Sequence, residues 1–146
     1  MFYKYDYSNM PNIYVKMSNN IDNSTNIDNF LNEWRSIYDQ SKPFNMIFDT
    51  IEVKPSLELF NHSFRIIKFI QELKEKPRLL RKSVIVVNST IVKQVLNFVF
   101  QIQPPICDVF ITEDTDYIQK KNISRKSSKS RDSLEIDDAL CVKAMK

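Results

Sequence analysis

The sequence predicts a mixed α/β fold, a mostly parallel sheet of about five strands with an antiparallel strand at one edge. Three observations indicate this class. Short apolar runs of strand type alternate along the chain with longer segments whose apolar residues recur at helical spacing. Asn, Asp, Ser and Pro gather between these segments, as they do in turns. Hydrophobic residues make up 42% of the 146 residues, which is enough to build one globular core.

The first two strands are expected to form an antiparallel hairpin. Residues 2–7 alternate aromatic and polar side chains, which places the tyrosines on one side of a strand. The polar stretch 8–12 is typical of a turn, and residues 13–17 form the second strand. A helix follows and is broken at Lys42-Pro43. Its apolar stripe consists of Ile27, Phe30, Leu31, Trp34 and Ile37.

Strands and helices then alternate to the end of the predicted domain. The apolar runs 44–49, 83–88 and 108–112 carry few charges, as expected of strands that are buried on both faces. The long helix between the first two runs has the apolar stripe Phe60, Phe64, Ile67, Ile70 and Leu73. The next helix has the stripe Ile91, Val95, Leu96 and Val99. A short final helix is expected at about residues 114–118. The order is β-β-α-β-α-β-α-β-α, which implies right-handed crossovers between parallel strands.

Residues 1–121 are expected to form this domain, and residues 122–146 a flexible, basic, Ser-rich tail with a short helix at its end. Six basic residues and no acidic ones lie between positions 120 and 131, and without them the net charge changes from +3 to −3. The six are Lys120, Lys121, Arg125, Lys126, Lys129 and Arg131. They predict nonspecific contact with nucleic acid or an anionic membrane, or else a solvated tail without a partner. Ser128 is a candidate phosphorylation site, since Arg125 precedes it by three residues.

The composition argues against several classes of enzyme. The chain has no glycine, so it lacks the glycine-rich loops that hold nucleotide phosphates and the GxSxG turn of many serine hydrolases. His62, the only histidine, has no neighbours in the pattern of a catalytic triad or a metal site. We therefore expect no enzymatic activity, no cofactor and no metal.

The cysteine content and the hydropathy pattern predict a cytoplasmic protein. Cys107 and Cys141 are too few for a disulfide framework, which indicates a reducing compartment. No apolar stretch approaches the roughly 18 residues of a membrane span, and the start lacks the apolar core of a signal peptide. Abundant Asn, Ile and Lys beside only two alanines are typical of an AT-rich genome, such as that of a protist or a large DNA virus.

Polar residues at the carboxyl ends of two predicted parallel strands form the candidate binding site. Asp49 and Asn88 end these strands, and Lys54, Ser56 and Thr90 follow in the loops that lead to the next helices. Ligands of open α/β sheets bind at this edge. The simpler interpretation is that these side chains hold turns and that Ser56 caps the long helix, a contribution of about 1 kcal/mol. The alternative is that Ser56 is phosphorylated, since a helix N-terminus favours a phosphate.

The middle of the chain resembles a known domain family. A strand ending at Asp49, Ser56 before a long helix, the segment 77–88, a helix, Pro104-Pro105 and a last strand follow one another as in the STAS domain of bacterial anti-sigma-factor antagonists. The segment 77–88 is also similar to the related core of the CRAL-TRIO lipid-binding domains. The STAS resemblance implies a non-enzymatic protein-binding domain in which a partner kinase phosphorylates the serine that corresponds to Ser56.

Two functions follow as hypotheses. The first is a regulatory domain that acts by protein–protein binding, with a phosphorylation switch at Ser56. The alternative, implied by the CRAL-TRIO resemblance, is a carrier of a lipid or another small apolar ligand in a pocket beneath the long helix, lined by Phe60, Phe64 and Phe69. Ligand pockets usually measure at least about 300 Å3, so a markedly smaller cavity would argue against the lipid alternative.

Overall fold

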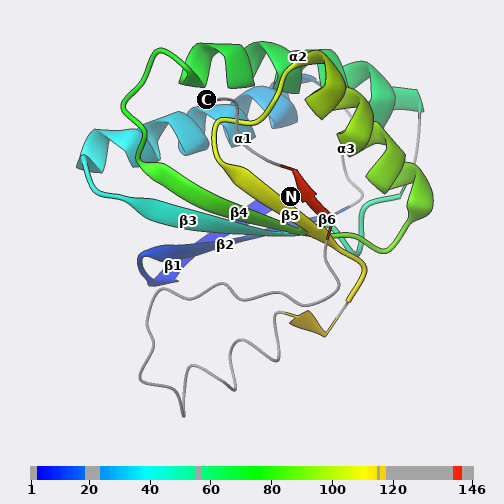
Figure 1. The fold of residues 1–146 in the computed structure, drawn as a ribbon, viewed down its shortest axis with the longest axis horizontal. Coiled ribbons are helices and arrows are strands. Elements are labelled where there is room, and N and C mark those ends of the chain that lie inside the picture. Colours follow the sequence, from blue (N-terminus) through cyan, green and yellow to red (C-terminus); the bar gives the residue numbers. More distant parts are fainter. Residues whose placement is uncertain (1–2, 19–23, 55–56, 115, 118–139, 143–146) are drawn as a thin grey trace.

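In the computed structural model, which describes residues 3–18, 24–54, 57–114, 116–117 and 140–142, six strands form one sheet (Figure 1). The elements in chain order are β1 (Tyr3–Asn9), β2 (Asn12–Met17), α1 (Ser24–Ile37), the 3-10 turn η1 (Tyr38–Gln40), β3 (Phe44–Asp49), α2 (Leu57–Leu73), β4 (Leu80–Val86), α3 (Thr90–Ile102), β5 (Asp108–Thr112) and β6 (Leu140–Val142). The strands lie side by side in the order β1-β2-β3-β4-β5-β6.

The pairing confirms a mixed, mostly parallel α/β sheet. Asp49 of β3 pairs with Val86 of β4, which in turn pairs with Thr112 of β5, so the three predicted core strands are parallel neighbours. β2 joins them in parallel on the other side. β1 pairs antiparallel with β2, as the predicted hairpin requires, and β6 pairs antiparallel with β5. The sheet therefore has one strand more than the sequence indicates.

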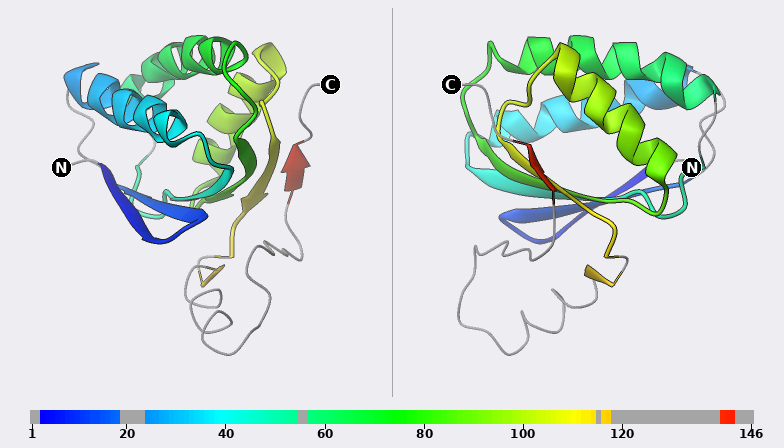
Figure 2. Two further views of the ribbon diagram at one scale, coloured as in Figure 1. Left: turned by 90° about the vertical axis from the view of Figure 1, so that its left-hand side faces the viewer. Right: turned by 45° about the vertical axis from the view of Figure 1, so that its right-hand side comes forward.

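Helices α1, α2 and α3 cover the same face of the sheet (Figure 2). Each of α1, α2 and α3 connects one parallel strand to the next, and each connection moves one strand further in the same direction. Because such crossovers are right-handed, they bring every helix to one side. None of these three helices lies on the opposite face, where Tyr117 packs against Ile47.

Tyrosines attach the hairpin to the helical layer. The Tyr5 hydroxyl donates a hydrogen bond to the backbone carbonyl of Phe30 at 2.9 Å. The Tyr7 hydroxyl donates to the Glu33 carboxylate at 2.6 Å. The Tyr3 ring lies 5.6 Å from the Phe30 ring, measured between centres. The tyrosines of β1 thus share the side that faces α1, as their alternation predicts.

The core lies between the helices and the sheet and continues through β3 to the far face. Phe44, Met46 and Phe48 face the helices and are at most 6% exposed. Ile47 points the other way and packs in a second cluster with Tyr117. This strand is therefore buried on both faces, as its low charge predicts.

Three residues near the end of the predicted tail are described, and they form a strand; the expected short helix elsewhere in residues 122–146 stays a prediction. Leu140–Val142 is strand β6, which pairs with β5 and extends the sheet. Three residues are too few for periodicity to distinguish a strand from a helix, so the sequence carries no signal for this element. The rest of the tail, with Ser128 and the basic run 120–131, lies outside the described residues. The end of the predicted final helix, beyond Tyr117, lies outside them too.

Candidate functional site

At the carboxyl edge of the sheet, several described side chains hold turns. The Asp49 carboxylate accepts a hydrogen bond from the backbone N–H two residues further on, at 3.1 Å. The Thr50 hydroxyl donates to the backbone carbonyl of Val86 at 2.7 Å. The Ser89 hydroxyl oxygen caps α3 by accepting from the backbone N–H two residues later, at 3.2 Å. For Asp49 these contacts support the simpler of the two interpretations, turn formation.

The other predicted site residues lie along the same edge without forming a hollow together. Lys54, Asn88 and Thr90 are exposed. Asp49 and Asn88 do share this edge, because β3 and β4 are parallel neighbours. None of these residues lines either of the two pockets described below. Ser56 lies outside the described residues, one position before α2 begins, so its role stays a prediction.

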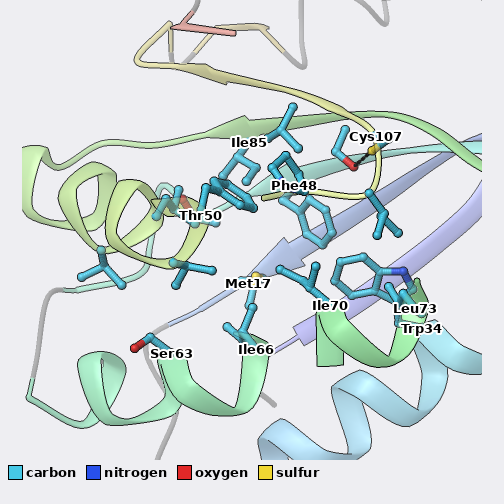
Figure 3. Close-up of a pocket in the computed structure, with 18 of the residues that line it drawn as sticks. Met17, Trp34, Phe48, Thr50, Ser63, Ile66, Ile70, Leu73, Ile85 and Cys107 are labelled. Atoms are coloured by element: carbon cyan, nitrogen blue, oxygen red, sulfur yellow. Dashed lines mark hydrogen bonds between the residues drawn. The ribbon is translucent and has the colours of Figure 1, made fainter. Parts of the chain in front are cut away.

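An apolar cavity lies between the helix-covered face of the sheet and helices α2 and α3 (Figure 3). Its volume is about 140 Å3. Side chains from both layers form its wall, among them Trp34, Phe48, Ile70, Leu73 and Ile85. We refer to this space as the apolar cavity.

The hydroxyl and thiol groups in this wall already have partners within the protein, whereas the buried indole N–H of Trp34 makes no hydrogen bond. The Ser63 hydroxyl donates to a backbone carbonyl of its own helix, and the Thr50 hydroxyl makes the bond described above. Ser83 Oγ and Cys107 Sγ lie 3.5 Å apart, joined by the dashed line in Figure 3. Burial raises the pKa of the Cys107 thiol to about 11, so this group stays neutral at physiological pH. The wall therefore presents hydrocarbon to a ligand.

The size of the apolar cavity limits what it can hold. A dry apolar cavity of about 150 Å3 holds a benzene-sized molecule, whereas most ligand pockets start at about 300 Å3. The apolar cavity by itself suits a small hydrocarbon group and is too small for a whole lipid.

A second pocket lies at the opposite, amino edge of the parallel strands, where α2 ends and β4 begins. Its volume is about 230 Å3. Three cationic residues from the loop between α2 and β4 line it: Lys74, Lys76 and Arg78. The Lys76 ammonium lies 5.9 Å from the centre of the Tyr38 ring, which forms another part of the wall. We refer to this space as the basic pocket.

The basic pocket adjoins the apolar cavity. The residues that line both are Leu73, Leu80, Pro105 and Ile106. The basic pocket was not predicted from the sequence, although its signal, the charged run 74–78 after the long helix, is visible in the chain. Such a run is usually a solvated surface, and only the fold brings Tyr38 and Pro105 next to it.

Aromatic side chains form a cluster on the outer surface of α2 and α3. Phe60 and Phe64, one turn apart on α2, both contact Phe98 of α3, with ring centres 5.2 and 6.0 Å from it. Phe60 is 38% exposed and Phe64 is 54% exposed. Neither of them lines the apolar cavity, and nor does the buried Phe69, so the predicted lining is wrong. We refer to Phe60, Phe64 and Phe98 as the aromatic cluster.

The described part of the chain contains no group of three or more His, Cys, Asp or Glu side chains placed to hold a metal ion. His62 is half-buried on α2. None of the helices that the structure describes is both long enough and apolar enough to cross a membrane.

Comparisons with known proteins do not identify the chain. No protein-family model matches it, and no curated protein and no solved structure matches it. The resemblance to the STAS domain therefore stays a prediction that rests on the order of the elements.

Proposed function

We propose that this chain is a non-enzymatic regulatory domain of STAS-like type that binds a helix of a partner protein on the outer face of α2 and α3. The exposed aromatic cluster is the observation that carries this proposal. Protein interfaces concentrate aromatic side chains at their centres. A contiguous exposed apolar patch on a protein surface commonly marks such an interface.

The composition of α3 supports the same face. Val92 and Val99 are buried and point to the core. On the outside, Ile91 and Ile102 are 56% and 50% exposed, and Phe98 belongs to the aromatic cluster. A helix that is apolar on more than one side is normally covered on more than one side. We therefore expect a partner to cover the outer face of α3.

Charge indicates the chemistry of the partner. Arg65 and Lys68 are exposed on α2 beside Phe64. Arg65 pairs with Asp28 at 3.0 Å, but its side chain remains 45% exposed, while Glu72 already pairs with an arginine of α1. The partner helix is therefore expected to carry an apolar stripe flanked by acidic residues. A second copy of this chain would bring like charges together.

Two features support the STAS-like and phosphorylation parts of the proposal. The strands β2 to β5 and the helices between them follow in the order that the resemblance requires. Ser56 stands directly before α2, four positions before Phe60 in the sequence. A phosphate at that position would add up to two negative charges at the start of the helix that carries the aromatic cluster, and it would repel an acidic partner.

The apolar cavity favours a second candidate, a carrier of a small ligand. Its wall consists mostly of hydrocarbon, with the Thr50 hydroxyl paired internally and only the Trp34 indole N–H without a hydrogen bond among the groups described above, as expected of a site for an alkyl or aromatic group. Its volume of about 140 Å3 argues against a complete lipid in this space alone.

A pair of synthetic peptides tests the protein-binding proposal. Both peptides form amphipathic helices with the same Leu and Phe stripe, but one has Glu and the other Lys along its flanks. We expect the Glu peptide to bind with a dissociation constant about tenfold lower, measured by fluorescence titration at low salt. The preference should shrink at high salt, because salt screens exposed charges.

Phe64→Ser removes the most exposed ring of the aromatic cluster and is expected to weaken the binding of the Glu peptide about tenfold. The protein should remain folded, because more than half of this side chain is exposed. Met10→Ser is a matched control, since Met10 is 42% exposed in the hairpin turn. Equal affinity for the two peptides, or unchanged affinity after Phe64→Ser, would contradict the proposal.

A further inference from the structure

The apolar cavity and the basic pocket form two adjoining spaces of opposite chemistry. Four residues line both spaces, so the two spaces share a wall made of these side chains. Together the two volumes exceed the roughly 300 Å3 at which ligand pockets begin. One end is hydrocarbon, and the other carries three cations.

We propose that this chain binds an amphipathic anion, an alkyl chain ending in an oxyanion, with the alkyl chain in the apolar cavity and the oxyanion in the basic pocket. A carboxylate and a phosphate monoester share this chemistry. The inference develops the small-ligand candidate and does not depend on the partner-binding face of α2 and α3.

The cationic end favours an oxyanion. Lys74, Lys76 and Arg78 all line the basic pocket, whereas Glu75, the carboxylate within this run, is exposed and does not line it. Ammonium and guanidinium groups bind carboxylate and phosphate oxygens by charge-assisted hydrogen bonds. A partly enclosed site strengthens these bonds, because less water screens them.

The other end favours a hydrocarbon chain. The hydroxyls of Thr50 and Ser63 already donate to backbone carbonyls, and Ser83 is paired with Cys107. A sugar or a nucleobase placed here would leave most of its polar atoms without partners, since the Trp34 indole N–H could serve only one of them, and this is unfavourable in an apolar space. An alkyl chain needs no partners and gains from leaving water.

Proline residues and a core contact give the site a defined frame. Pro104-Pro105 and Pro77 fix the backbone on two sides of the basic pocket. Leu73 and Leu80, which line both spaces, are buried, and Ile106 is half-buried. The junction between the two spaces thus consists of aliphatic side chains that an alkyl chain can pack against.

Four probes test the proposal by isothermal titration calorimetry with the full chain: decanoate, decyl phosphate, decanol and inorganic phosphate, each below its micelle concentration. At least one of the two amphipathic anions should bind about tenfold more tightly than decanol. Inorganic phosphate should bind more weakly than either, because it has no alkyl chain. The stronger of the two anions identifies the head group. Binding of decanol as tight as that of both anions would overturn the proposal, and so would tighter binding of inorganic phosphate.

Charge reversal tests the basic pocket. Lys74→Glu combined with Arg78→Glu changes two exposed residues. The double variant should bind the preferred anion about tenfold more weakly, while its affinity for decanol stays unchanged. Arg81→Glu is the matched control, because Arg81 is an exposed cation that does not line either space. If the double variant keeps the affinity for the anion, the oxyanion does not lie in the basic pocket and the proposal fails.

Filling the apolar cavity tests the other end. Val92→Phe places a larger side chain in the wall of the apolar cavity and should weaken the binding of decanoate, decyl phosphate and decanol alike. Val95→Phe, at a half-buried position of the same wall, provides the test if the first variant does not fold. A folded, filled variant that binds all three as before would overturn the proposal. Phe64→Ser should bind them normally, which separates this inference from the partner-binding proposal.

Discussion

A chain without glycine must place another residue where the backbone turns left-handed. In the part of the chain that the structure describes, Ser41 does so, with φ of 55° and ψ of 33°, directly after η1. Its backbone N–H donates to the carbonyl of Tyr38 at 3.1 Å, which closes the turn. A residue with a Cβ atom pays roughly 1–2 kcal/mol for this conformation, because its Cβ atom approaches a backbone oxygen.

Ser41→Gly should therefore stabilise the protein by about 0.5–1 kcal/mol, after the greater entropy of glycine in the unfolded chain is subtracted. The measurement is the free energy of unfolding in urea. Ser36→Gly serves as the control, since Ser36 is exposed inside α1 and glycine there should destabilise by about 0.5 kcal/mol. A loss of stability in Ser41→Gly would show that the left-handed turn is not strained.

At the scale of single elements, local periodicity was sufficient for most of the fold. The alternation in residues 2–7 and the apolar runs of β3, β4 and β5 each reflect burial within one segment, so one segment suffices to recognise them. Strand β6 was missed because three residues carry no period, and its pairing with β5 depends on the rest of the sheet. The tail therefore cannot be deleted as a unit without removing this edge strand.

The sites were harder to predict than the elements. Phe60 fits the helical stripe of α2, yet it lies on the outside, because the direction of that stripe depends on how α3 packs. The basic pocket joins Tyr38, Arg78 and Pro105 from three distant segments, a juxtaposition that no local pattern encodes. Asp49 was placed correctly at the carboxyl edge, since parallel pairing alone decides that position.

Substitutions of Ser56, the residue before α2, distinguish its two proposed roles, helix cap and phosphorylation switch. If Ser56 is only a cap, Ser56→Ala should cost about 1 kcal/mol, and Ser56→Asp, which keeps a capping oxygen, should cost little. If Ser56 is also a switch, Ser56→Asp should weaken the Glu peptide several-fold, while Ser56→Ala binds it normally. Ser89→Asp places the same charge at the observed cap of α3 and serves as the control. Normal peptide binding by Ser56→Asp would rule out the switch.

At the scale of the whole molecule, the positions of the candidate sites follow from the two-layer architecture. Helices α1, α2 and α3 lie on one face of the sheet (Figure 2), the apolar cavity lies beneath α2 and α3, and the basic pocket adjoins it at the amino edge, where α2 ends. The aromatic cluster lies on the outer surface of the same helical layer. A ligand beneath α2 and α3 and a partner above them would therefore contact the same two helices. Coupling between the two follows if the ligand shifts either helix.

Buried hydroxyl and thiol groups make the stability of the whole molecule sensitive to alkaline pH. Burial raises the pKa of Tyr5, Tyr38 and Tyr117 well above the usual range, and it raises the pKa of Cys107 to about 11. In the unfolded chain the same groups lose their protons at about pH 8.5 for Cys and about pH 10 for Tyr. Above about pH 9 the unfolded chain therefore binds fewer protons than the folded one, so the free energy of unfolding must fall as pH rises.

The urea midpoint should accordingly be nearly constant from about pH 7 to about pH 8 and then decrease steadily towards about pH 11. Tyr5→Phe isolates the contribution of the Tyr5 hydroxyl to this loss of stability. It removes the hydroxyl that donates to the Phe30 carbonyl, which should cost about 1 kcal/mol at neutral pH. It should also reduce the alkaline loss by roughly 1 kcal/mol at about pH 10.5, because Phe has no proton to lose in the unfolded chain. Parallel pH profiles of the variant and the parent would mean that the Tyr5 hydroxyl titrates alike in both states, which its burial and hydrogen bond forbid.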